Sequence, residues 1–313
     1  MTNVAAAAAP TPAGAAPDIC IVLNPRSGKR RADARERFEE AMRRHPGRFR
    51  LRVVPKGGNP VTEARSAAED GAATLVAAGG DGTICAVASV AHERGLPLGV
   101  VPMGTFNYFA RSLGMPEDVD AALDVVAQGV ARPVVVGAVN GKLFLNNASL
   151  GLYPAILANR EGTYRRWGRS RMAAHWSLLT TVLRFRRPVR LRVTVDGRSL
   201  GRRTPLVFVA RSAYQLELFG LEGAADVAEG RFGLFLAPDV GRWGLLRFAA
   251  RLLLRSMERG RDFDFVAGRA IDVETRARRR SVACDGERET MTQPFRFRIS
   301  EDPLMVIVPE GAG

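Results

Sequence analysis

Two clusters of polar residues in this 313-residue sequence have the composition and spacing to do chemistry. The first is Gly79-Gly80-Asp81-Gly82-Thr83, between an apolar segment and a segment with helical spacing. Glycines let backbone N–H groups approach phosphate oxygens, and the N-terminus of a following helix attracts anions. Asp81 would then lie beside phosphates, where a carboxylate either holds Mg²⁺ or accepts a proton. The run predicts a phosphate-binding turn; the alternative is a glycine turn in which Asp81 caps the helix.

The second cluster lies far downstream, where Asp285 and Glu287 flank Gly286. Residues two apart in a strand lie on one face, and the glycine permits a sharp turn that aims both carboxylates into a cleft. One of them could then act as a base toward an acceptor hydroxyl. The alternative is an exposed β-turn with two surface acids.

Two more polar, glycine-bearing loops follow predicted strands. Asn24–Gly28 comes after the apolar run Ile19–Leu23, and Pro102–Asn107 comes after a run that ends at Val101. In an open α/β sheet, ligands bind beyond the carboxyl ends of the strands. We therefore expect these two loops and Gly79–Thr83 to meet at one rim, although each loop alone fits ordinary turn chemistry.

The elements that must position these loops alternate between strand and helix from Asp18 to about Val130, which predicts an open doubly wound α/β domain. The expected strands are Ile19–Leu23, Phe49–Val54, Thr74–Ala78 and Leu98–Val101, and the expected helices are Lys29–Arg44, Pro60–Asp70 and Ile84–Arg94.

Beyond residue 130 the pattern changes to apolar or alternating runs joined by Asn140-Gly141 and Asp196-Gly197, dipeptides that favour tight hairpins. This predicts an antiparallel β-sandwich with two long helices, Thr163–Arg187 and Arg242–Arg259. The expected strands include Val189–Val195, Pro205–Ala210, Phe232–Leu236, Ser281–Cys284 and Leu304–Val308. We divide the chain into a disordered Ala/Pro tail (1–17), the α/β domain (18–130) and the sandwich domain (131–309).

Composition excludes several classes of protein. No apolar run is long enough to span a bilayer, which argues against an integral membrane protein. The three cysteines show no metal-ligand spacing, and no GxSxG hydrolase motif is present. The net charge is +14, and residues 131–309 hold 31 basic against 17 acidic side chains. This excess favours an anionic partner, either nucleic acid or a phospholipid surface.

Taken in order, the motifs resemble those of bacterial diacylglycerol kinase-like lipid kinases, which are related to sphingosine, ceramide and NAD kinases. The shared motifs are NPRSG (Asn24–Gly28), GGDGT (Gly79–Thr83), PMGTFN (Pro102–Asn107), NNASLG (Asn146–Gly151) and DGE (Asp285–Glu287). The resemblance runs from Ile19 to about Val308.

The resemblance implies an enzyme that transfers the γ-phosphoryl of Mg-ATP to a lipid hydroxyl in phospholipid metabolism, with 18–130 binding ATP and 131–309 the lipid acceptor. It implies nucleotide contacts from Asn24, Pro25, Arg26, Ser27, Gly28, Gly79, Gly80, Asp81, Gly82, Thr83, Gly104, Thr105 and Asn107. The catalytic candidates are Glu287, Asp285 and Asp81, and which of them takes the proton is left open.

The resemblance also implies metal contacts. Asp81 is expected to serve the Mg²⁺ of the nucleotide. A second divalent ion is expected in similar proteins near an Asp-Gly turn, and here Glu229 replaces the usual aspartate before Gly230. Upstream, Ala210–Gln215 replaces a Gly-Asn and glycine-rich stretch, so we expect a different acceptor pocket.

The segment Arg160–Arg192 contains ten arginines, one acid and interleaved aromatics. Such a composition suits the headgroup layer of an anionic membrane. We predict membrane docking through Arg165, Arg166, Trp167, Arg169, Arg171 and Trp176. For Arg242–Arg259, with arginines at intervals of four, a solvated basic face is expected instead.

We therefore expect a cytoplasmic enzyme, peripherally bound to the inner face of the membrane, with a lipid substrate and no nucleic-acid partner, because no RNA-binding or zinc pattern occurs. A homodimer is left open. Two other functions are kept: a soluble small-molecule kinase similar to NAD kinases, and a protein that binds nucleotide or lipid without catalysis.

Overall fold

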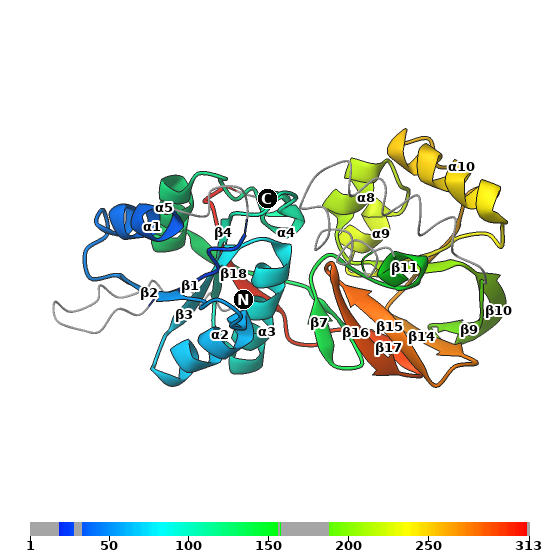
Figure 1. Ribbon diagram of the computed structural model, residues 1–313, viewed down its shortest axis with the longest axis horizontal. Coiled ribbons are helices and arrows are strands. Elements are labelled where there is room, and N and C mark those ends of the chain that lie inside the picture. The colour runs from blue at the N-terminus through cyan, green and yellow to red at the C-terminus, as the bar shows by residue number, and fades with distance from the viewer. Residues whose placement is uncertain (1–18, 28–32, 156, 158–187, 312–313) are drawn as a thin grey trace, which may run out of the picture.

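The computed structural model describes residues 19–27, 33–155, 157 and 188–311. These residues form an α/β lobe and a β-rich lobe that lie side by side in Figure 1. The fold class predicted from the sequence, an open doubly wound α/β domain followed by an antiparallel β-sandwich with helices, is confirmed.

The α/β lobe is built around a six-stranded sheet of order β2-β1-β3-β4-β18-β5, in which β1 to β4 run parallel. Helices α2 and α3 cover one face of the sheet, where Ile84 packs in the same core as Val22. Helices α1 and α5 cover the other face, where Phe38 packs in the same core as Ile21. The elements are β1 (Ile19–Leu23), α1 (Ala34–Met42), β2 (Phe49–Val53), α2 (Pro60–Glu69), β3 (Thr74–Gly79), α3 (Asp81–Arg94), β4 (Leu98–Pro102), α4 (Tyr108–Ser112), α5 (Val119–Gln128), β5 (Val130–Val134) and β18 (Leu304–Val308).

The position of β18 differs from the sequence prediction, which placed Leu304–Val308 in the sandwich. The strand pairs in parallel with β4, through Val306 and Leu98, and antiparallel with β5. That prediction was wrong. A continuous apolar run suits a strand buried on both faces, and this sheet has helices on both sides. Figure 1 shows β18 in red inside the blue and cyan lobe.

The second lobe consists of two six-stranded sheets, β10-β9-β14-β17-β6-β7 and β13-β12-β11-β8-β15-β16. Their inner faces share one apolar core that includes Phe144, Val193, Val209 and Phe297. The strands are β6 (Gly137–Val139), β7 (Lys142–Phe144), β8 (Asn147–Gly151), β9 (Val189–Val195), β10 (Arg198–Thr204), β11 (Leu206–Ala210), β12 (Phe232–Leu236), β13 (Asp264–Gly268), β14 (Ala270–Thr275), β15 (Arg279–Cys284), β16 (Glu287–Thr292) and β17 (Phe295–Ile299).

Three short helices cover the outer face of the sheet that contains β8: α8 (Ala213–Phe219), α9 (Ala224–Ala228) and α10 (Arg242–Leu253). They share a second apolar cluster with β11, β12 and β13. Each helix contributes to it, for example through Leu216, Val227 and Phe248. The helix predicted over Arg242–Arg259 ends earlier, at Leu253. Arg255, beyond it, has a left-handed φ of 53°.

Two-residue turns join three hairpins. Asn140-Gly141 joins β6 to β7, Asp196-Gly197 joins β9 to β10, and Asp285-Gly286 joins β15 to β16. Both residues of each turn have positive φ, for example 47° at Asp285 and 85° at Gly286, which is the conformation that Asn-Gly and Asp-Gly favour. The third turn carries the candidate acids into position.

Within the described residues, no helix is both long and apolar enough to cross a bilayer. The predicted helix Thr163–Arg187 lies outside the described residues.

Candidate active site

The loops after β1, β3 and β4 meet at the carboxyl edge of the first sheet. Asn24 N donates to Ala78 O at 2.9 Å, and Met103 N donates to Gly79 O at 2.8 Å. Gly80 and Gly104 approach so closely that a Cβ on Gly104 would lie 2.7 Å from Gly80 Cα. Glycine at these two positions lets the loops touch.

Asp81 holds the start of α4. Its Oδ2 accepts a hydrogen bond from Asn107 N at 2.9 Å, and its Oδ1 accepts from Phe109 N at 3.5 Å. Asn107 is buried with a left-handed φ of 51°, and its Oδ1 accepts from Gly104 N at 2.8 Å. Asp81 therefore caps a helix, as the simpler alternative proposed, but the capped helix is α4 rather than its own α3.

Thr83 links the loop after β1 to the loop after β3. Asn24 Nδ2 donates to Thr83 Oγ1 at 2.9 Å, and the Thr83 side chain is buried against Gly79. This bond fixes the NPRSG loop relative to GGDGT. Arg26, by contrast, is exposed, and its guanidinium donates to Gly58 O at 3.1 Å.

A cavity of 440 Å³ lies beside this rim. Its lining residues are Ser27, Asp33, Ala34, Arg37, Phe38, Pro102, Met103, Gly104, Asn107, Glu117 and Val119. Three of them, Ser27, Gly104 and Asn107, are predicted nucleotide residues. The volume lies in the range typical of small-molecule sites.

The carboxylate of Asp285 is buried and accepts hydrogen bonds from three backbone N–H groups. Its Oδ2 accepts from Leu145 N at 2.7 Å, and its Oδ1 accepts from Asn146 N at 2.8 Å and Asn147 N at 3.1 Å. In return Asp285 N donates to Asn147 O at 3.0 Å. Asp285 thus fastens the β15–β16 hairpin to the NNASLG segment.

Glu287 begins β16 and reaches across to the α/β lobe. A Cβ on Gly82 would lie 2.9 Å from Glu287 Oε1, so the carboxylate packs directly against the first turn of α3. Lys142 stands nearby on β7 and forms an ion pair with Glu289, with Nζ 2.8 Å from Oε2. The structure therefore brings the GGDGT turn and the DGE turn together.

The pKa of each of the three acids at this junction is raised above its ordinary value. Burial raises the pKa of Asp81, and the negative charge of Asp285 raises it further, while backbone N–H groups of α4 oppose the shift. Burial also raises the pKa of Asp285, against the hydrogen bonds from residues 145–147. Glu287 keeps an exposed surface, yet desolvation between the lobes raises its pKa, and Lys142 opposes the shift.

An aromatic group borders Asp81 where the lobes meet. The ring of Tyr108 stacks on Phe106 with centroids 5.4 Å apart and lies 6.2 Å from the ring of Phe219 on α8. Burial raises the pKa of the Tyr108 hydroxyl to about 12, with Tyr153 and Asp81 adding to the shift. Phe106 is 52% exposed. The junction thus offers an apolar, partly open surface beside the acids.

Two known domains match the chain. Residues 18–139 match the diacylglycerol kinase catalytic domain, and residues 154–308 match the YegS C-terminal NAD kinase beta sandwich-like domain. The chain belongs to the diacylglycerol kinase-like family. The resemblance inferred from the motifs is therefore confirmed. The first match covers most of the α/β lobe and the second most of the sandwich, although β18, inside the second match, pairs in the α/β sheet.

Curated relatives of this diacylglycerol kinase-like chain are named as kinases. It is 43% identical over 144 residues to a probable lipid kinase YegS-like of Pseudomonas aeruginosa, which covers 45% of this chain and 46% of that protein. It is 40% identical over 139 residues to a diacylglycerol kinase of Bacillus subtilis, covering 42% and 45%. The matched segment spans about half the length of these relatives.

A solved structure of a diacylglycerol kinase from Bacillus anthracis superposes with a TM-score of 0.66 at 17% identity, covering 95% of this chain and 98% of that one. At this identity the likeness establishes a shared fold.

The residues around Glu229 do not fit the second divalent ion. Arg231 Nη2 lies 2.8 Å from Asp226 Oδ1 and 2.6 Å from Glu229 Oε2, so one guanidinium engages both carboxylates. A second, Arg211, donates to Val227 O at 2.9 Å, and burial lowers its pKa to about 10. A metal ion would have to displace these cations. In the part of the chain that the structure describes, no group of three metal-ligating side chains occurs.

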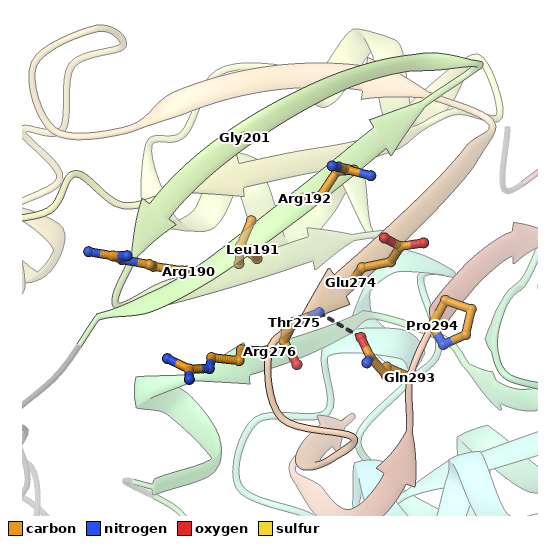
Figure 2. A pocket seen from close by; sticks show the side chains of 9 residues that line it. All are labelled: Arg190, Leu191, Arg192, Gly201, Glu274, Thr275, Arg276, Gln293 and Pro294. Atoms are coloured by element: carbon orange, nitrogen blue, oxygen red, sulfur yellow. Dashed lines mark hydrogen bonds between the residues drawn. The ribbon is translucent and has the colours of Figure 1, made fainter.

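A larger hollow of 670 Å³ lies away from these acids, on the sheet that contains β9 and β14. Figure 2 shows Arg190, Arg192 and Arg276 around it, with Thr275 N donating to Gln293 Oε1 at 2.8 Å. None of its lining residues belongs to the predicted site. We treat it as a feature of the basic sandwich surface.

Some predicted site residues lie outside the described residues: Gly28 of the nucleotide loop, and Arg165, Arg166, Trp167, Arg169, Arg171 and Trp176 of the membrane segment.

Sequence reasoning missed Lys142, Tyr108 and Phe106. Lys142 is one of only three lysines in the chain and directly follows the Asn140-Gly141 turn, a signal that could have drawn attention to it. Phe106 lies within the motif Pro102–Asn107, and Tyr108 directly follows it. Their role depends on α8, which lies more than a hundred residues away in the chain, so no local pattern predicts it.

Proposed function

We propose that this chain is an ATP-dependent lipid kinase that transfers the γ-phosphoryl group of Mg-ATP to a hydroxyl of a membrane lipid. One observation carries the proposal: Glu287, from the sandwich, packs against Gly82 of the glycine-rich turn. This contact supports the proposal, because phosphates bound at that turn would lie beside a carboxylate of the second lobe. The family and the names of the curated relatives support the same class of reaction.

ATP is expected to bind at the rim formed by the three strand loops. Backbone N–H groups of Gly79–Thr83 and the N-terminus of α3 suit the phosphates. The cavity beside Ser27, Gly104 and Asn107 offers room for the rest of the nucleotide. Asn24 and Thr83 hold two of these loops in place, so their hydrogen bond serves positioning.

Glu287 is the proposed base. The acceptor oxygen forms a bond to the γ-phosphorus as the bond to the bridging β–γ oxygen breaks, ADP leaves, and the hydroxyl proton passes to the Glu287 carboxylate. A raised pKa suits this role, because a base works best when its pKa lies near the working pH. Asp285, whose oxygens accept three backbone bonds, positions the turn.

Asp81 is the residue that would hold Mg²⁺ together with the phosphates, since this ion is commonly bound by one or two carboxylates and substrate oxygens. When bound with ATP, Mg²⁺ neutralises phosphate charge. The hydrogen bonds from Asn107 and Phe109 keep the Asp81 carboxylate oriented.

The test is a transfer assay with γ-labelled ATP and a bacterial lipid extract, in which mass spectrometry identifies any phosphorylated lipid. We expect a labelled lipid, and a loss of at least about tenfold in turnover for Asp81→Asn and for Glu287→Gln. A parallel reaction offers NAD as acceptor. Labelled NADP without labelled lipid would instead support a soluble kinase, and nucleotide binding without any ADP formation would support a non-catalytic protein.

A further inference from the structure

The two most exposed large apolar side chains of the described residues lie on α10 and at its C-terminal cap. Trp243 is 83% exposed and Leu254, at the C-terminal cap of the helix, is 76% exposed. Arg247 and Ala250 lie between them and are exposed as well. The spacing of four, three and four residues places all four on one stripe of the helix. We call Trp243, Arg247, Ala250 and Leu254 the outer stripe.

The opposite side of α10 is already used for packing. Leu245 is buried against Leu152, and Phe248 and Leu252 pack on the apolar cluster beneath the helices. The helix therefore completes the core with its inner side, and the outer stripe takes no part in that packing. Single exposed apolar residues are common, but a Trp this exposed on a stripe with Leu and Arg indicates a contact surface.

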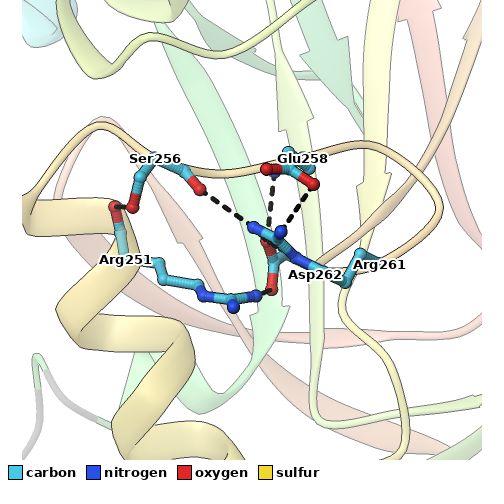
Figure 3. Close-up of polar contacts among 5 residues, drawn as sticks. All are labelled: Arg251, Ser256, Glu258, Arg261 and Asp262. Carbon is cyan, nitrogen blue, oxygen red and sulfur yellow. Dashed lines mark hydrogen bonds and ion pairs between the residues drawn. The ribbon is translucent and has the colours of Figure 1, made fainter.

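The C-terminal end of α10 is fixed to the fold by charge, as Figure 3 shows. Arg251 Nη1 lies 2.5 Å from Asp262 Oδ1, and Arg261 Nη2 lies 2.8 Å from Asp262 Oδ2. Burial acts to raise the pKa of Asp262, but the hydrogen bonds from both arginines and from Glu258 N outweigh it and hold the pKa at about 2. Asp262 therefore stays ionised at neutral pH and anchors the helix.

These contacts also divide the arginines that the sequence placed on one basic face. Arg251 pairs with Asp262, and Arg259 lies over the ring of Phe265, with its guanidinium carbon 5.4 Å from the centroid. Arg247 stays on the outer stripe between two apolar residues. The exposed surface of α10 is thus amphipathic rather than simply basic.

We propose that the outer stripe of α10 docks the protein on an anionic phospholipid surface. Tryptophan prefers the boundary between water and acyl chains, leucine adds apolar contact, and arginine binds lipid phosphates. The sequence of α10 contains no acidic residue that would be repelled by such a surface. This charge complementarity, joined to the exposed Trp and Leu, favours a lipid surface over a second copy of the chain.

Docking through α10 would bring lipid to the proposed acceptor side. Helices α8, α9 and α10 cover the same sheet face and share one apolar cluster. From α8, Phe219 reaches Tyr108 at the junction with Asp81. The link to catalysis rests on the proposed lipid kinase function, whereas docking itself does not.

The test measures co-sedimentation of the full chain, without ATP, with vesicles of phosphatidylcholine alone or mixed with phosphatidylglycerol. We expect the wild type to prefer the anionic vesicles, and Arg247→Glu to lower the partition constant at least about fivefold. Trp243→Ser combined with Leu254→Ser should lower it by a similar factor or more. Because these side chains are exposed, unfolding temperatures should match the wild type.

Two matched controls locate the effect. Arg296→Glu reverses one exposed arginine on the other sheet, and Val130→Ser removes a 48% exposed apolar residue from the first lobe. Both should bind vesicles as the wild type does. Wild-type binding by the Trp243/Leu254 variant, or an equal loss in Arg296→Glu, would overturn the proposal. So would sedimentation analysis showing that the stripe variants abolish a dimer of the free protein.

Turnover separates docking from catalysis. On lipid dispersed in detergent, the Trp243→Ser/Leu254→Ser variant should match the wild type, while on anionic vesicles it should be slower by the same factor as its loss of binding. If no lipid is phosphorylated under any condition, the proposed function fails, and the vesicle result still decides the docking. A variant with Trp167→Phe and Trp176→Phe leaves Trp243 as the single tryptophan. Its emission should shift to the blue on anionic vesicles, and an unchanged spectrum counts against insertion.

Discussion

The carboxylate of Glu287 lies against Gly82, so close that a Cβ at that glycine would come within 2.9 Å of Oε1. Gly82 belongs to the first turn of α3 in the α/β lobe, and Glu287 begins β16 in the sandwich. Their contact joins the two clusters that the sequence singled out, across more than two hundred residues of chain. A Cβ at the fourth position of the GGDGT motif would therefore require the end of the Glu287 side chain to move.

Gly82→Ala should therefore lower turnover while leaving the fold intact. The new methyl group pushes the Glu287 carboxylate away, and a displacement of about 1 Å in an active site costs up to about a hundredfold in rate. Turnover with saturating ATP and detergent-dispersed lipid checks it. Gly201→Ala is the control, because a Cβ there meets nothing within 4 Å. Full activity in Gly82→Ala would show that this contact is not used in catalysis.

Glu287→Gln should lower the activity of the protein and raise its stability at neutral pH. The pKa of Glu287 is raised in the folded protein, so its ionised form is destabilised there relative to the unfolded chain. Below about pH 4 both states keep the proton, and wild type and variant should be equally stable. As the pH rises through the window between the two pKa values, the wild type should lose stability relative to the variant. Denaturant unfolding at pH 4 and pH 7 measures this difference; a variant less stable at pH 7 would contradict it.

Lys142 should shift the acid limb of the pH–rate profile through its effect on the pKa of Glu287. Its positive charge opposes the raised pKa of Glu287, so Lys142→Gln removes that opposition and should move the acid limb of kcat/KM to higher pH. Glu289→Gln offers the reverse test, since it frees Lys142 from its 2.8 Å ion pair and should move the limb to lower pH. Shifts in the same direction for both variants would be inconsistent with Glu287 as the base.

The rim formed by the loops after β1, β3 and β4 was predictable because these loops obey a general rule. Asn24, Gly80 and Gly104 each follow a parallel strand, and carboxyl ends of parallel strands meet at one edge. The order of motifs then indicated the family. Local patterns also predicted the Asp285-Gly286 turn, since the dipeptide favours positive φ at both residues.

Contacts between distant segments were not predictable in the same way. The sandwich prediction for Leu304–Val308 failed because an apolar run fits any doubly buried strand, and only strand pairing decides which sheet takes it. The spacing of Arg247, Arg251 and Arg259 suggested one basic face. In the structure, however, Arg251 pairs with Asp262 and Arg259 lies over the ring of Phe265, so neither stays on that face. Both partners lie beyond the helix.

Asp285→Ala should cost stability as well as activity. The change leaves the N–H groups of residues 145–147 without the carboxylate that accepts from them. Each buried donor without a partner costs about 1–3 kcal/mol, so we expect the free energy of unfolding to fall by about 3 kcal/mol or more. Chemical denaturation measures it. Glu287→Gln provides the contrast, because it should lose activity without this loss; an Asp285→Ala protein as stable as the wild type would remove the positioning role.

The stability of the sandwich should not depend on a divalent ion, because Arg231 already engages Asp226 and Glu229. Chelation with EDTA should leave the unfolding temperature of the wild type unchanged. Arg231→Ala exposes two unpaired carboxylates, so the variant should lose about 1 kcal/mol of stability and regain part of it when Mg²⁺ is added. Arg203→Ala is the matched control, since it breaks a similar surface pair with Asp239 and should not respond to Mg²⁺. A wild-type protein that melts earlier in EDTA would mean that a metal ion, and not the guanidinium, neutralises this turn.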